Sequence, residues 1–173
     1  MEKLNFFKRA VETLFGSLGG RKFDQFDAGI LTAMLMLAAV DGDISKDELD
    51  RFRELAEGCK GCNEKSFAEL WDAALHSAGY LLLQTKLLSR EELVETFVRE
   101  AERPFVSQVM QEVAKDRERA FHHLECLAAS DGDYSDIERA CIGALVERVK
   151  QARDRAMAER FSRAAVYKCG LQI

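Results

Sequence analysis

Residues 37–48 read Leu-Ala-Ala-Val-Asp-Gly-Asp-Ile-Ser-Lys-Asp-Glu, and ninety residues later positions 127–138 read Leu-Ala-Ala-Ser-Asp-Gly-Asp-Tyr-Ser-Asp-Ile-Glu. Eight of the twelve positions are identical. In each copy an apolar helical stretch runs into an Asp-Gly turn, and a Ser-x-x-Glu capping box opens the next helix. Because a duplicated unit describes the fold, the sequence predicts two helical hairpins that pack about a pseudo-two-fold axis.

The remainder of the chain is predicted to be helical as well. One proline, eleven glycines and long runs of apolar residues at helical spacing indicate an all-α helical bundle. The 173 residues are about the size of one domain, and no low-complexity linker divides them. We therefore predict a single domain over 1–173, with repeat 1 at about 24–57, repeat 2 at about 117–150 and a C-terminal helical extension at 151–173.

Local signals predict where the helices begin and end. Asp116 is expected to cap the helix that leads into the second motif, and Pro104 to begin a new segment or kink an existing helix. The apolar run Tyr80–Leu88 either extends a helix or forms a turn against the core. The other predicted helices cover about 3–15, 24–40, 46–58, a stretch after Asn63, a stretch after Ser89, and 136 to about 167.

Composition and charge narrow the classes of function. A net charge of −5 argues against non-specific binding to nucleic acid. No run reaches the roughly 18 apolar residues of a membrane span, and the N-terminus lacks the pattern of a secretory signal. Five cysteines, an odd number, fit a reduced cytoplasmic protein better than a disulfide scaffold. The expected location is therefore the cytoplasm.

The acidic side chains of the two turns are candidate ligands for a divalent cation. A carboxylate just past a helix C-terminus is disfavoured by roughly 0.3–1 kcal/mol, and a bound cation would offset that cost. Ca²⁺, Mg²⁺ and Mn²⁺ prefer oxygen ligands, so they are expected before Zn²⁺. The candidate metal ligands are Asp41, Asp43, Glu48, Asp131, Asp133 and Glu138.

A purely structural interpretation of these residues stays open beside the cation site. Asp-Gly is a good tight turn, and the two glutamates already serve the capping boxes. An EF-hand is excluded, because loop positions one and three would fall on Leu37 and Ala39, which offer no side-chain oxygen.

The duplicated signature resembles that of the tellurite-resistance TerB family, which is also found as a TerB-like domain in some membrane-anchored co-chaperones of the DnaJ type. The family pattern A-x-x-D-G-x-x-x-x-x-E is met twice, and the resemblance covers roughly residues 5–150. It implies an all-α fold, a bacterial cytoplasmic setting, no enzymatic activity, and a role in metal-stress response with cation binding through the acidic residues. The matching positions are Ala38, Asp41, Gly42 and Glu48, then Ala128, Asp131, Gly132 and Glu138.

Other residues offer weaker chemistry. Cys59 and Cys62 form one C-x-x-C pair, which is half of a structural zinc site. They are interpreted as reduced structural or surface thiols, with a redox-responsive disulfide or a soft-metal or metalloid site as alternatives. Further ligands for such a site would come from His76, His122, His123, Cys126 or Cys141.

No phosphate-binding loop or nucleophile motif is visible, so no catalytic or cofactor-binding residue is predicted and the protein is expected not to be an enzyme. An unidentified protein partner is expected. The C-terminal stretch is basic, and it either contacts an acidic partner or an anionic membrane surface or forms the solvated face of the last helix. Its basic residues are Arg148, Lys150, Arg153, Arg155, Arg160, Arg163 and Lys168.

Overall fold

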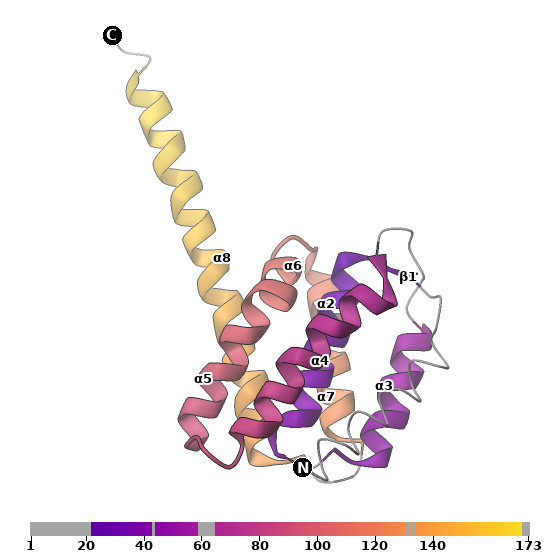
Figure 1. Ribbon diagram of the computed structural model, residues 1–173. Helices are drawn as coiled ribbons and strands as arrows, with labels where there is room; N and C mark the ends of the chain where they lie inside the picture. The colour runs from indigo at the N-terminus through magenta and orange to yellow at the C-terminus, as the bar shows by residue number, and fades with distance from the viewer. Residues whose placement is uncertain (1–21, 43, 59–64, 131, 133, 171–173) are drawn as a thin grey trace.

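The computed structural model describes residues 22–42, 44–58, 65–130, 132 and 134–170. Within these ranges the regular secondary structure is helical, apart from one antiparallel pair of strands of two residues each. The predicted all-α bundle is therefore confirmed (Figure 1). None of the described helices combines the length and the apolar character needed to cross a membrane. The elements are β1 (Lys22–Phe23), α2 (Gln25–Val40), α3 (Lys46–Gly58), β2 (Lys65–Ser66), α4 (Phe67–Gln84), α5 (Arg90–Ala101), the π-helix η1 (Glu102–Val106), α6 (Ser107–Val109), α7 (Ala114–Ala128) and α8 (Asp136–Gly170).

Helix α2 is the centre of the bundle. Asp24 caps its start by accepting a hydrogen bond from the backbone N–H of Asp27 at 2.7 Å. Every residue from Phe26 to Val40 is buried, because α4, α5, η1 and α7 all pack against this helix. Apolar residues on all faces of the helix account for this burial.

Pro104 lies inside a π-helical turn between α5 and α6. A proline within a helix lacks the N–H donor and its ring clashes with the carbonyl four residues earlier, and the wider π turn accommodates both defects. The carbonyl of Glu102 accepts hydrogen bonds from the backbone N–H of Ser107 and from its hydroxyl at 3.0 Å. The Pro104 carbonyl approaches α2 so closely that a Cβ atom at Gly29 would overlap it.

Three helix connections meet at one end of the bundle, which we call the corner end (Figure 1). They are the α2–α3, α4–α5 and α7–α8 connections. The first and last contain Gly42 and Gly132, whose φ angles of +84° and +85° suit glycine. A Cβ atom at Gly42 would lie 3.0 Å from the Thr85 hydroxyl, and Arg90 donates a hydrogen bond to the carbonyl of Asp136 at 2.8 Å. The α4–α5 connection therefore lies against parts of both repeats.

The observed helix ends agree with most predictions. One was wrong: Asp116 does not cap α7, which begins at Ala114 after an extended Val113 without a side-chain cap. Asp116 lies in the first turn instead, where a negative charge is favoured by the helix dipole. The run Tyr80–Leu88 divides, because α4 ends at Gln84 and a turn follows. The helix predicted at 3–15, the Asn63 cap and the Cys59–Cys62 pair lie outside the described residues.

Two glycine-to-alanine substitutions test the packing of α2 against η1. Gly29→Ala should destabilise the fold by about 1–3 kcal/mol or more, because the new methyl group meets the Pro104 carbonyl. Gly143→Ala, at an exposed α8 position with no atom within 4 Å of the added Cβ, should stabilise it by about 1 kcal/mol through helix propensity. Urea unfolding measures both. Equal stability of the two variants would contradict the close contact.

Candidate functional site

The structure describes three of the six predicted cation ligands. Asp41 is exposed at the C-terminus of α2, where its backbone N–H bonds the carbonyl of Ala39. Glu48 and Glu138 lie in the first turns of α3 and α8, at the corner end. The remaining three candidates, Asp43, Asp131 and Asp133, lie outside the described residues.

Both predicted capping boxes are present at the corners. In the first, Glu48 accepts from the backbone N–H of Ser45 at 2.7 Å, and the Ser45 hydroxyl accepts from the N–H of Glu48 at 3.0 Å. In the second, Glu138 accepts from the N–H of Ser135 at 2.9 Å, and the Ser135 hydroxyl accepts from the N–H of Glu138 at 3.3 Å. The repeated sequence therefore forms the same local structure twice.

A third capping box shows that capping does not require burial. Ser89 and Glu92 at the start of α5 make the same reciprocal hydrogen bonds, at 2.8 and 3.3 Å, yet Glu92 is exposed. By contrast, Glu48 is 3% exposed and Glu138 is 2% exposed. Burying a carboxylate is costly unless its charge is compensated. Helix capping alone therefore does not explain why these two glutamates are buried.

The two buried glutamates also interact electrostatically. Burial is the main reason that the pKa of Glu48 is raised to about 8, and the hydrogen bonds from Ser45 oppose this rise. The negative charges of Asp41 and Glu138 raise it further. Because Glu48 and Glu138 come from different repeats, the fold brings the two acidic corners within electrostatic reach of each other.

The described carboxylates do not by themselves complete a metal site. In the part of the chain that the structure describes, no group of three or more His, Cys, Asp or Glu side chains is arranged to hold an ion. A full set of ligands at the corner end would need some of Asp43, Asp131 and Asp133 in addition to Glu48 and Glu138. The structure thus supplies two buried carboxylates, Glu48 and Glu138, at the corner end.

Sequence reasoning missed another buried acid, Asp27 in the first turn of α2. It is 3% exposed, and Arg119 from α7 approaches its carboxylate at 3.2 Å. Burial and then the neighbouring Asp24 raise the pKa of Asp27, and Arg119 opposes this. The Arg119 guanidinium also lies 5.0 Å from the ring centre of Phe26. The only local signal was an acid in the first turn after an N-cap, which does not indicate burial.

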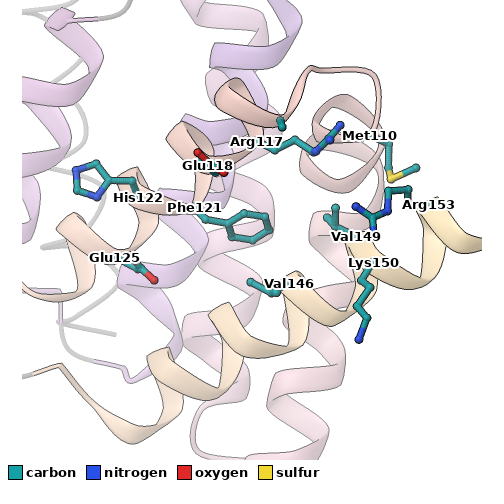
Figure 2. Close-up of a pocket in the computed structure, with 11 residues that line it drawn as sticks. Met110, Arg117, Glu118, Phe121, His122, Glu125, Val146, Val149, Lys150 and Arg153 are labelled. Atoms are coloured by element: carbon teal, nitrogen blue, oxygen red, sulfur yellow. The ribbon is translucent and has the colours of Figure 1, made fainter.

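A shallow groove of about 490 Å³ between α7 and α8 is a second candidate surface. Figure 2 shows Phe121 and Val146 toward its middle, with Arg117, Lys150 and Arg153 toward one end. Val146 is 46% exposed. The groove thus offers an apolar floor with charges at its rim, the kind of surface on which an amphipathic helix packs.

Several basic residues of α8 form ion pairs within the chain. Arg148 contacts the carboxylate of Glu102 at 2.6 Å, which ties α8 to η1. Lys150 lies 3.7 Å from Glu147, and Arg153 lies 3.9 Å from Asp154. These contacts reduce the net positive charge that α8 presents. Contact with an acidic partner or an anionic membrane remains a prediction.

The burial of Glu48 predicts a distinctive pH dependence of stability. Because its pKa is raised from 4.5 to about 8, the folded chain retains a proton that the unfolded chain releases. The free energy of unfolding should therefore fall as the pH rises from about 4.5 to about 8. Urea unfolding at several pH values should show that Glu48→Gln flattens this fall.

Glu92→Gln is the matched control for that experiment. The hydrogen bonds from Ser89 lower the pKa of Glu92, so its contribution to stability is present above its ordinary pKa and is lost as the pH falls. Glu92→Gln should leave the decline between about pH 4.5 and 8 in place. Parallel curves for the wild type and Glu48→Gln would show that Glu48 does not carry the excess proton.

Comparisons with known protein families, with curated proteins and with solved structures find no match for this chain. The functional interpretation therefore depends on the duplicated motif and on the geometry of the corner end. One observation is independent of any resemblance to a family: Glu48 and Glu138 are buried, whereas Glu92 is exposed.

Proposed function

We propose that the protein is a non-enzymatic, TerB-like domain of bacterial stress response that binds a divalent cation at the corner end of its bundle. The observation that carries the proposal is the burial of Glu48 and Glu138 beside one another's charge. A cation between the two repeats would compensate both carboxylates at once. The association with metal or tellurite stress comes from the resemblance of the duplicated motif.

The chemistry of the corner end favours a hard cation. Carboxylate oxygens are the ligands preferred by Ca²⁺, Mg²⁺ and Mn²⁺. Glu48 and Glu138 each use one oxygen, Oε2, in their capping boxes, and a carboxylate can accept several contacts at once. The further carboxylates would come from Asp43, Asp131 and Asp133 of the predicted set. Because Glu48 holds a proton near neutral pH, binding of the cation would release that proton.

A thermal melt of EDTA-treated protein with added Ca²⁺, Mg²⁺, Mn²⁺ or Zn²⁺ tests the proposal. A ligand present at 100 times its Kd stabilises the folded state by about 2.7 kcal/mol. In a chain of this size that corresponds to a rise in Tm of about 5–10 °C. We expect the rise with at least one of the three hard cations, and a larger rise at about pH 8 than at about pH 6, where a proton competes for Glu48.

Variants locate the cation. The rise in Tm should disappear in Glu48→Gln with Glu138→Gln, and in Asp41→Asn with Asp131→Asn, while Glu92→Gln should retain it. A rise with zinc alone that survives these substitutions would direct attention to Cys59 and Cys62. Absence of a rise with every ion would contradict the cation site.

The alternative function is a protein-interaction module whose turns are purely structural. The groove between α7 and α8 favours it, because Val146 is an apolar side chain left half-exposed at the groove floor. This alternative predicts that no divalent cation changes the Tm. It also predicts that Val146→Asp removes partner binding without lowering stability, whereas the corner substitutions leave partner binding unchanged.

A further inference from the structure

A cysteine, a histidine and an arginine gather between α3 and α7. Cys126 is partly exposed on α7, and its Sγ lies 3.5 Å from Nε2 and 3.9 Å from Nδ1 of His122, one turn earlier. Arg51 lies beside the same thiol from α3, and hydrogen bonds with Glu54 and Cys126 raise the pKa of Arg51.

This combination of side chains is suited to assisting a reaction of the Cys126 sulfur. The imidazole of His122 can accept the thiol proton, and the guanidinium of Arg51 stabilises the negative sulfur that results. Glu54 accepts a hydrogen bond from Arg51 at 2.8 Å and so positions it. A cation beside the sulfur opposes binding of a metal ion, and the described residues provide no third ligand. The geometry therefore favours a reactive thiol over a soft-metal site.

The surroundings of His122, His123 and Cys141 distinguish the Cys126 cluster from other histidines and cysteines of the chain. His122 lines the α7–α8 groove, and its ring points away from Phe121 and Val146 (Figure 2). The adjacent His123 is different, because burial lowers its pKa to about 4 and keeps it neutral. Cys141 in α8 is fully buried, and burial raises the pKa of its thiol. Cys141 thus provides an internal reference for an unreactive cysteine.

We propose that Cys126 is a site of thiol–disulfide exchange with small-molecule disulfides, assisted by His122 and Arg51. The thiol proton passes to His122, and the Cys126 sulfur attacks one sulfur of a disulfide R–S–S–R. The bond between the two small-molecule sulfurs breaks as the mixed disulfide Cys126–S–S–R forms. The leaving R–S⁻ takes the proton from His122 and departs as R–SH, so atoms and charge balance. This activity is independent of the proposed cation site.

The test uses the full chain with Cys59, Cys62 and Cys169 replaced by Ser, which leaves Cys126 and Cys141. Oxidised glutathione at pH 7 is the probe, and intact-protein mass spectrometry follows the adduct. A single adduct should form on Cys126. His122→Ala and Arg51→Ala should each slow its formation about three- to tenfold, because each variant loses a group that accepts the thiol proton or stabilises the sulfur as it becomes negative.

Matched controls separate this chemistry from a general effect on the fold. His76→Ala replaces an exposed histidine of α4, and Arg53→Ala breaks the equivalent ion pair with Asp50 in α3; neither should change the rate. The milder His122→Gln should slow adduct formation as well, and both controls should react at the parent rate. Rates within twofold of the parent for the His122 and Arg51 variants, or an adduct on Cys141, would overturn the proposal.

Discussion

The complete burial of helix α2 is the constraint on which the rest of the structure depends. A helix that is apolar on all its faces must be surrounded, and α4, α5, η1 and α7 surround it. The closest approach is that of Pro104 to Gly29, where only the absence of a side chain lets the π-helical turn reach α2. This arrangement fixes the positions of α3 and α8, which begin at the two acidic corners.

At those corners the local hydrogen bonding is favourable, whereas the burial of carboxylate charge is unfavourable. The Ser-x-x-Glu box satisfies the first N–H groups of a helix whether or not its glutamate is exposed, as Glu92 demonstrates. Burial of Glu48 and Glu138 adds a cost that capping does not require. A proton on Glu48 neutralises the charge of that carboxylate and so lowers the cost of burying it. A cation would occupy the same electrostatic position, which is why the corner end is the better-supported candidate site.

The thiol cluster between α3 and α7 is chemically distinct from the corners, although each of its two helices borders one of them. Arg51 follows Glu48 by about one helical turn, and Cys126 precedes the second acidic turn by a similar distance. The carboxylates suit a hard cation, whereas the sulfur and its basic neighbours suit reaction with an electrophilic sulfur. The cysteine pair that the C-x-x-C spacing suggested, Cys59 and Cys62, lies outside the described residues, so the structure draws attention to a thiol that no motif marks.

The sequence by itself determined the helical class, the two capping boxes of the repeated motif and the two glycine turns. These features depend on periodicity or on contacts between residues three or four positions apart, which a sequence displays directly. Only the tertiary structure decided which acids are buried, because Glu92 and Glu48 have the same local pattern and differ in what packs over them. The same holds for Asp27 with Arg119 and for Arg51 with Cys126, whose partners are distant in the chain. Local sequence fixes a side chain's hydrogen bonds to its own helix, whereas its charge state depends on neighbours that folding brings to it.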